Sequence, residues 1–205
     1  MIPATLFSQS SAWDRWGPEL VNRLNTAKET GYLSEEEKKV VLFMNMARYD
    51  GSLFAETFLV NYIADHNTDN TGYVRSLYRD LRKVSEFTPL LVEGDLTAIA
   101  RDHAEKSGKS GRVGHQGFNK RFEPVMGNPY NHVGENCSYG FDRAIDIVIT
   151  LLIDEGIQGT GHRENILNEG FNSVGVAIRP HRNYRVNCVI DFGRRTRSDL
   201  NQVPY

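Results

Sequence analysis

The segment from 141 to 155 limits the possible folds most strongly, because it reads as a helix that is apolar almost all the way round. Its apolar residues are Ala144, Ile145, Ile147, Val148, Ile149, Leu151, Leu152 and Ile153. A helix laid on a surface shows one apolar stripe, whereas a helix that is apolar on most faces must be covered on several sides. We therefore expect this helix to lie sandwiched between other layers.

Four more helices are predicted before it. A capping box, formed by Ser34 and Glu37, starts a buried helix that runs through 40–48. Apolar residues at spacings of three and four predict two helices within 50–86. A similar stripe predicts another over 95–107.

The later part of the chain has a different pattern. Residues 108–134 are rich in glycine and proline and read as a long loop. Alternating apolar residues at 174–178 and 184–192 predict two strands joined by a turn at 181–183. Helices followed by a few strands, without a regular βαβ rhythm, favour an α+β fold with an antiparallel sheet.

Composition argues against several classes of partner. The 205-residue chain has a net charge of −2, so no strongly basic face is indicated and nucleic acid is not an expected partner. No stretch reaches the roughly 18 apolar residues that a transmembrane helix requires. The first residues lack the basic and apolar regions of a signal peptide, although a chain whose leader had been removed would read the same.

The two cysteines, Cys137 and Cys188, are too few for a disulfide scaffold. They could form one bridge or remain reduced as small buried side chains, and the strand pattern directs Cys188 towards a core. Neither has a second sulfur or a histidine at close zinc-site spacing, so metal ligation by these thiols is not expected.

Four chemically active side chains stand in glycine-flanked settings: His115, Glu135, Glu155 and His162. Imidazole and carboxylate groups bind divalent metals or move protons near neutral pH. Neighbouring glycines let the backbone bend closely around such groups. We expect folding to gather these four at one site; the alternative is that each only satisfies backbone groups of its own loop.

Glu155 is expected to face inward, because it follows Leu152 by three residues on the same helical stripe. A carboxylate near a helix C-terminus opposes the helix dipole, so an imidazolium or a bound cation would have to compensate it. Asp154 lies one position round the helix and could take this role instead.

Other residues compete for the site or support it. His132 lies three residues before Glu135 and could replace His115 as its partner. His103 lies on an apolar helix face and is read as a hydrogen-bonded core histidine, and Arg163 as a clamp on a chain turn. The sequence has no nucleophile motif, paired helical histidines, Walker loop or dinucleotide fingerprint.

Several short motifs in the chain occur together in a known family. They are Asn45-x-x-Arg48, Gly134-Glu135-Asn136, Gly161-His162-Arg163-Glu164-Asn165-Ile166-Leu167, Phe171-Asn172-Ser173-Val174-Gly175-Val176 and Val189-Ile190-Asp191-Phe192-Gly193. In this order and spacing they resemble the CAP superfamily, which comprises cysteine-rich secretory proteins, antigen 5 and plant pathogenesis-related proteins. The bacterial branch is the most similar.

The resemblance implies an α+β fold, a three-layer α-β-α sandwich with a small antiparallel sheet. The CAP/SCP-like domain would span 34–193, with an N-terminal extension over 1–33, a helical insertion over 50–86 and a C-terminal tail over 194–205. It also implies a secreted or cell-surface protein whose cleft holds His115, Glu135, Glu155 and His162, whereas the disulfides of eukaryotic relatives are absent.

From this we expect a ligand-binding or metal-binding module. His115 and His162 would bind a divalent metal, zinc foremost, while Glu135 and Glu155 hold the far ring nitrogens or a bound water. Asn136, Arg163 and Asp154 would support them. A metal-dependent, peptidase-like hydrolase with Glu135 or Glu155 as general base is one alternative, and a lipid or sterol carrier is another.

Overall fold

A computed structural model describes residues 9–68, 71–157 and 159–196. Its elements, in chain order, are α1 (Gln9–Trp16), α2 (Pro18–Leu24), α3 (Glu35–Tyr49), α4 (Gly51–Phe54), the π-helical turn η1 (Ala55–Leu59), α5 (Val60–His66), α6 (Gly72–Leu81), β1 (Leu91–Val92), α7 (Gly94–Ser110), α8 (Phe118–Phe122), β2 (Tyr130–Tyr139), α9 (Ala144–Ile153), α10 (Gly161–Ile166), β3 (Ser173–His181) and β4 (Arg185–Arg195). The predicted helices and the late β3–β4 hairpin are confirmed. Parts of both terminal segments, residues 1–8 and 197–205, lie outside the described residues.

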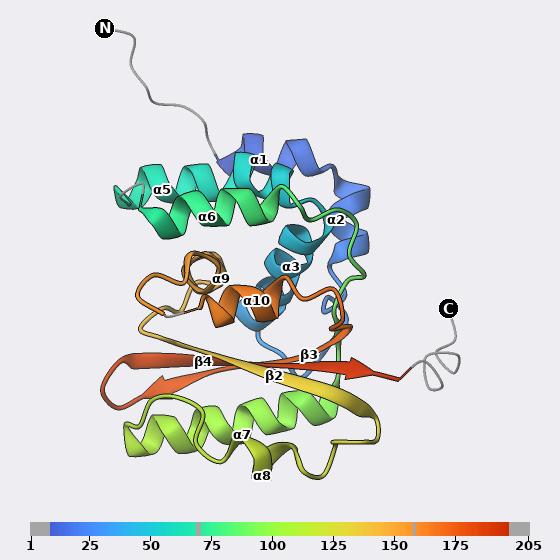
Figure 1. Ribbon diagram of the computed structural model, residues 1–205, viewed down its shortest axis with the longest axis vertical. Helices are drawn as coiled ribbons and strands as arrows, with labels where there is room; N and C mark the ends of the chain where they lie inside the picture. The colour runs from blue at the N-terminus through green and yellow to red at the C-terminus, as the bar shows by residue number, and fades with distance from the viewer. Residues whose placement is uncertain (1–8, 69–70, 158, 197–205) are drawn as a thin grey trace, which may run out of the picture.

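The sheet forms the middle layer (Figure 1). Helices α7 and α8 cover one face, and α3, α9 and α10 cover the other. The N-terminal helices and the helices between 51 and 81 form a further layer beyond α3 and α9. The predicted α-β-α sandwich is therefore present, with an additional helical layer on one side.

The strand order in the sheet is β1-β3-β4-β2. The three long strands pair antiparallel, as expected, but the two-residue β1 pairs parallel with β3. Strand β2 was not predicted, because 108–134 was read as one loop. The loop in fact contains α8 and ends where β2 starts, at Tyr130. This strand lies at the sheet edge, so side chains from both faces can meet around it.

Helix α9 occupies the sandwiched position that its composition predicts. Its Ile147, Val148, Ile149 and Leu152 are fully buried in the main core, which also includes residues of α3, β3 and β4. The helix is shorter than the predicted segment, because it runs only from Ala144 to Ile153.

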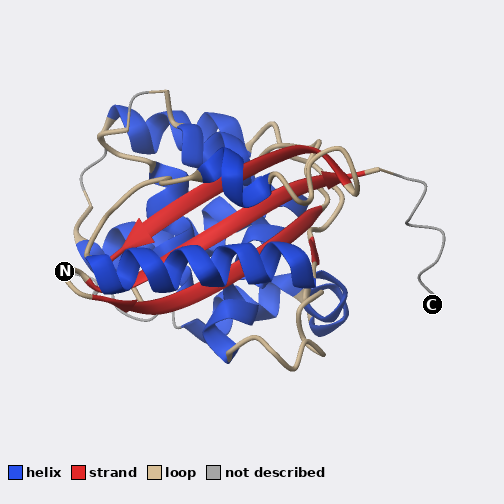
Figure 2. Ribbon diagram, turned by 90° about the horizontal axis from the view of Figure 1, so that it is seen from below, coloured by secondary structure: helices blue, strands red, loops and turns tan. Residues whose placement is uncertain are grey.

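Helix α7 lies directly on the opposite face of the sheet (Figure 2). A Cβ atom at Gly175 of β3 would come within 2.2 Å of backbone atoms of Leu96 and Thr97. Only glycine permits so close an approach of helix and strand. The helix therefore holds its inward side chains, His103 among them, against the sheet.

The two cysteines are free and buried on different faces of the sheet. Cys188 belongs to the main core on the α3 and α9 side, and Cys137 to a smaller core beneath α7. The disulfide that the sequence left open is therefore not formed. No helix within the described ranges is both long enough and apolar enough to cross a membrane.

The N-terminal helices attach to the rest through aromatic side chains. Trp16 is buried and donates a hydrogen bond from Nε1 to Oγ1 of Thr57, 3.1 Å away. Trp13 packs against Phe43 and Phe58, with ring centroids 5.7 and 5.1 Å away. Residues of α1 and η1 thereby join the same core as α3 and α9.

Arg48 connects distant loops from inside the fold. Its Nη1 donates to the carbonyls of Ile166 and Asn168 at 2.8 and 2.7 Å, and its Nη2 to those of Thr88 and Phe171 at 3.1 and 2.7 Å. Burial lowers the pKa of Arg48 to about 10, which leaves it charged at neutral pH. The side chain therefore ties α3 to the end of α10, to the loop that follows it and to the segment before β1.

Arg48→Met should lower the free energy of unfolding by more than about 3 kcal/mol, because buried carbonyls lose charged donors. Arg23→Met is the control, since Arg23 is exposed over the Tyr49 ring and its loss should cost less than about 1 kcal/mol. Urea denaturation of both variants measures the difference. Equal, small losses would contradict this role for Arg48.

Candidate functional site

The candidate site is built around the edge strand β2. Successive side chains of a strand point to opposite faces, so Glu135 and Cys137 lie on the α7 side and Asn136 lies on the α10 side. Consistent with this, Asn136 donates from Nδ2 to the carbonyl of His162, 2.9 Å away, and Cys137 belongs to the core beneath α7.

Glu135 is a buried carboxylate that is held by Arg121 and His115. Arg121 donates from Nη1 to Oε2 at 2.6 Å and from Nη2 to Oε1 at 2.9 Å. Nδ1 of His115 lies 2.8 Å from Oε1. Burial alone would raise the pKa of Glu135, but the bonds from His115 and Arg121 outweigh it and lower the pKa to about 2. Glu135 is therefore ionised throughout the neutral range.

Asp191 lies directly across from Glu135 on β4 and is fully buried. Neither of its oxygens accepts a hydrogen bond from a described residue. Burial, and then the charge of Glu135, raise the pKa of Asp191 well above its usual value. Like charges opposed across two strands repel, so Asp191 is held as the neutral acid and can donate its proton to Glu135.

The second histidine is held by a different carboxylate from the one predicted. Oδ1 of Asp154 lies 2.7 Å from Nδ1 of His162. Its Oδ2 accepts from the backbone N–H groups of His162 and Arg163 at 2.9 and 3.4 Å, which caps the start of α10. Asp154 is 3% exposed and thus takes the inward position.

The prediction that Glu155 faces inward was wrong. Helix α9 ends at Ile153, and Asp154 has a left-handed backbone with φ of 56°. The chain therefore leaves the helix before Glu155, and the three-residue spacing from Leu152 no longer places both on one stripe. Glu155 is exposed, and the carboxylate that holds His162 is that of Asp154.

His115 and His162 do come together. Their ring centroids lie 6.4 Å apart, although they come from opposite sides of β2. Each Nδ1 lies against a buried carboxylate, and neither Nε2 has a hydrogen-bond partner among the described residues. Because the side chain of His115 is 47% exposed and that of His162 is 18% exposed, the pair is accessible from solvent.

The supporting and competing residues are also located. Asn165 donates to Oδ1 of Asn136 at 2.8 Å, which links α10 to β2. Arg163 is buried and donates to the carbonyls of Leu152 and Ile153, so the prediction that it clamps a turn is confirmed. His132 is exposed and stacks on a phenylalanine of the main core, away from Glu135.

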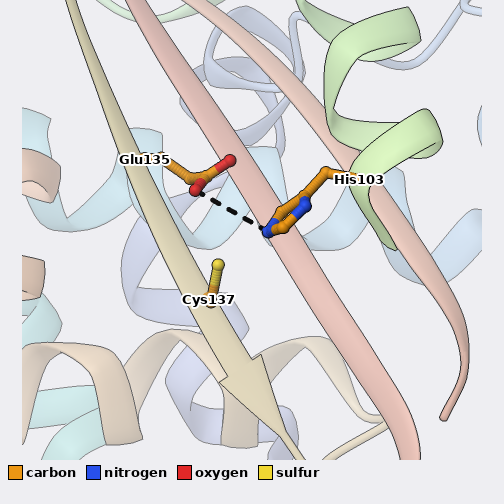
Figure 3. A group of neighbouring side chains, drawn as sticks. All are labelled: His103, Glu135 and Cys137. Atoms are coloured by element: carbon orange, nitrogen blue, oxygen red, sulfur yellow. Dashed lines mark ion pairs between the residues drawn. The ribbon is translucent and has the colours of Figure 1, made fainter. Parts of the chain in front are cut away.

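Three buried residues lie next to the exposed histidine pair: His103, Glu135 and Cys137 (Figure 3). Nε2 of His103 lies 2.9 Å from the carbonyl of Gly114, which confirms the prediction of a hydrogen-bonded core histidine. The same Nε2 is 3.9 Å from Oε1 of Glu135. Burial lowers the pKa of His103 and raises that of Cys137, so both are uncharged at neutral pH.

Two residues of the site were missed from the sequence. Arg121 lies on α8, whose Phe118 and Phe122 are four residues apart and pack together, a short helical signal within the predicted loop. Asp191 stands between apolar residues along β4, and this alternation alone would predict an exposed side chain. Only the packing of α7 on the second face of the sheet buries it.

Asp191→Asn should stabilise the protein increasingly as the pH rises. A raised pKa means that the folded state keeps a proton that the unfolded chain releases above its ordinary pKa of 3.8, so Asp191 costs stability from there upward. An asparagine can donate to Glu135 without this cost.

Urea denaturation at about pH 4 and about pH 7 measures the free energy of unfolding of Asp191→Asn and of the native protein. The advantage of the variant should be larger at about pH 7 than at about pH 4. Asp102→Asn, which removes an exposed partner of Lys106, should change stability by less than about 1 kcal/mol at either pH. A pH-independent loss in Asp191→Asn would contradict a neutral Asp191.

Comparisons with known proteins indicate the family to which this fold and site belong. The model of a family described as "CAP: Cysteine-rich secretory protein family" matches residues 75–192, more than half of the chain. A comparison with curated proteins gives no match. Among solved structures, Schistosoma mansoni venom allergen-like protein 4 aligns with a TM-score of 0.50 and 11% identity, over 82% of this chain and 93% of that chain.

Two bacterial structures align with lower scores. An outer surface protein from Borrelia burgdorferi has a TM-score of 0.46 and 20% identity, over 62% of this chain and 96% of that one. An SCP-domain extracellular protein from Bacillus anthracis has a TM-score of 0.46 and 16% identity, over 81% of this chain but only 45% of its own length. With the sandwich fold and the family match together, this chain belongs to the CAP, or cysteine-rich secretory protein, family.

Proposed function

We propose that the protein is a secreted binding module that takes up a divalent metal, zinc foremost, at the exposed edge of β2, through Nε2 of His115 and Nε2 of His162. The observation that carries this is the way each ring is held. Both Nδ1 atoms face buried carboxylates, at 2.8 Å for Glu135 and 2.7 Å for Asp154. Metal-binding histidines typically hold their second ring nitrogen in this way, which fixes the tautomer and orients the free nitrogen.

The environment suits a site with open positions. Zinc prefers imidazole nitrogen and usually takes four ligands, so two histidines leave room for water or for a donor atom of a bound molecule. The two carboxylates do not need to bind the metal, because each accepts a hydrogen bond from the Nδ1–H group of a metal-binding ring. Secretion is proposed from the family description alone, cysteine-rich secretory proteins.

Binding is favoured over hydrolysis by the state of the acids. A general base works best with a pKa near the operating pH, whereas the pKa of Glu135 is lowered to about 2 and both its oxygens are bonded to Arg121. Glu155, the other proposed base, is exposed and outside the helix that would have turned it inward. The histidine pair therefore offers ligands for a metal, but none of the described carboxylates near it is well placed as a base.

The Asp154 contact should tune metal affinity. Asp154→Asn is expected to weaken zinc binding roughly 10–100-fold, because the ring of His162 loses its anionic partner. Glu155→Gln is the matched control, one residue along and exposed, and should leave the affinity unchanged. Isothermal titration calorimetry on metal-free protein measures both.

The double variant His115→Ala with His162→Ala sets the baseline of that experiment. It should abolish zinc uptake at the histidine pair. Zinc affinity that is equal in the native protein, Asp154→Asn and the double variant would reject the proposed metal pair.

A second candidate, uptake of an apolar ligand such as a single-chain lipid, is favoured by one observation. A cavity of about 500 Å³ lies where the N-terminal helices meet the inserted helices. Its aromatic lining comes from Trp13, Phe43, Phe58 and Tyr62, with charged side chains around them. Ligand pockets of a few hundred Å³ with aromatic walls are typical of small-molecule sites.

Tryptophan fluorescence tests the cavity directly, because Trp13 lines it whereas Trp16 is buried beside it. A fatty acid that enters the cavity should quench the tryptophan fluorescence of the native protein and of Trp16→Phe, but not that of Trp13→Phe. Delipidated native protein that shows no quenching at any fatty-acid concentration below micelle formation would remove this second candidate.

A further inference from the structure

We propose that His103, Glu135 and Cys137 form a second, buried zinc site that does not use His162. This inference does not rest on the proposed function, because the exposed pair and the buried trio use different ligand atoms, although Oε1 of Glu135 also holds the ring of His115. Nothing in the comparisons assigns a metal to these three residues. The trio combines imidazole nitrogen, carboxylate oxygen and cysteine sulfur, a donor set that selects zinc over magnesium or calcium.

The fold brings the three donors together from two elements. Glu135 and Cys137 are two residues apart on β2 and therefore share one face of the sheet. His103 reaches them from α7, which lies across that face (Figure 3). All three residues are buried, with one ligand atom from each within 4.8 Å of the others.

The spacing is close to what a tetrahedral ion needs. With Zn–N near 2.0 Å and Zn–S near 2.3 Å, neighbouring ligand atoms lie about 3.3–3.8 Å apart. Nε2 of His103 and Oε1 of Glu135 are 3.9 Å apart. Nδ1 of His115 lies 3.8 Å from Sγ of Cys137 but only 2.8 Å from Oε1, which is a hydrogen-bond distance, so His115 stays on Glu135 and the fourth position is left for a water molecule.

Metal entry changes the ends of the three side chains and costs the hydrogen bond from His103 to the carbonyl of Gly114. The thiol proton of Cys137 leaves to solvent, and the ring proton of His103 moves from Nε2, where it is donated to Gly114, to Nδ1. Glu135 gives Oε1 to the metal and keeps Oε2 on Nη1 of Arg121, at 2.6 Å. The thiolate and Glu135 together offset the two charges of the ion, and the cluster then carries the single positive charge of Arg121.

Cobalt(II) is the probe, because a bound thiolate gives a sulfur-to-cobalt charge-transfer absorption that nitrogen and oxygen ligands lack. Metal-free full-length protein is titrated with cobalt(II), and zinc is then added to displace it. The native protein should show the thiolate band and lose it on zinc addition. His162→Ala should keep the band, because the exposed pair is not involved.

Two variants identify the ligands. Cys137→Ser should lose the thiolate band, and His103→Gln should weaken cobalt binding at least about 10-fold. Cys188→Ala is the matched control: this thiol is also buried and free but lies in the other core, so its loss should leave the band intact. Circular dichroism checks that each variant is folded.

The native spectrum alone can overturn the inference, whatever the variants do. Cobalt binding without a thiolate band would leave only the exposed histidine pair, and the buried site would be rejected while the proposed function stands. A band that persists in Cys137→Ser and disappears in Cys188→Ala would also reject it. A thiolate band, together with a zinc affinity that calorimetry finds unchanged in Asp154→Asn, would instead favour the buried site over the exposed one.

Discussion

The burial of the Glu135 carboxylate is the constraint on which the site depends. An ionised acid at a sheet edge beneath a helix must be compensated, because burial of an unpaired charge is costly. Arg121 and His115 provide this compensation from the segment that follows α7, at 2.6 to 2.9 Å. Burial, and then the same charge, raise the pKa of Asp191 on the neighbouring strand and keep it neutral. One carboxylate therefore orders the loop, orients a histidine and sets the protonation of a second acid.

The position of β2 at the sheet edge explains how residues from both faces converge. His115 approaches from the α7 side, and His162 approaches from α10 on the other side, yet their rings lie 6.4 Å apart. In a central strand these groups would be separated by the sheet itself. The capping of α10 by Asp154 then fixes the second ring in the same way that Glu135 fixes the first. The result is two imidazoles, each held from behind, on one accessible edge.

The sequence predicted those helices and strands whose own residues follow a clear apolar pattern. The composition of α9 predicted a sandwiched helix, and alternation predicted the β3–β4 hairpin. Strand β2 was missed because its glutamate, asparagine and cysteine are all buried, so that polar residues stand where an apolar pattern would mark a strand. Asp191 was missed for a related reason, since only the packing of α7 makes its face of the sheet an interior one.

The choice between Asp154 and Glu155 shows a further limit. Helical spacing favoured Glu155, but a single left-handed residue at the end of α9 redirected the chain and placed Asp154 inward. His115, Glu135 and His162 do lie together in the structure, at positions to which glycine-flanked motifs and the family resemblance both pointed. Their role as a metal site stays a prediction.

A crystal soaked in zinc and measured by anomalous scattering tests that role most directly. We expect an anomalous peak within bonding distance of Nε2 of both His115 and His162, with Glu135 and Asp154 still on the Nδ1 atoms. A map with no peak near either imidazole, under conditions in which surface residues of the same crystal bind zinc, would contradict it.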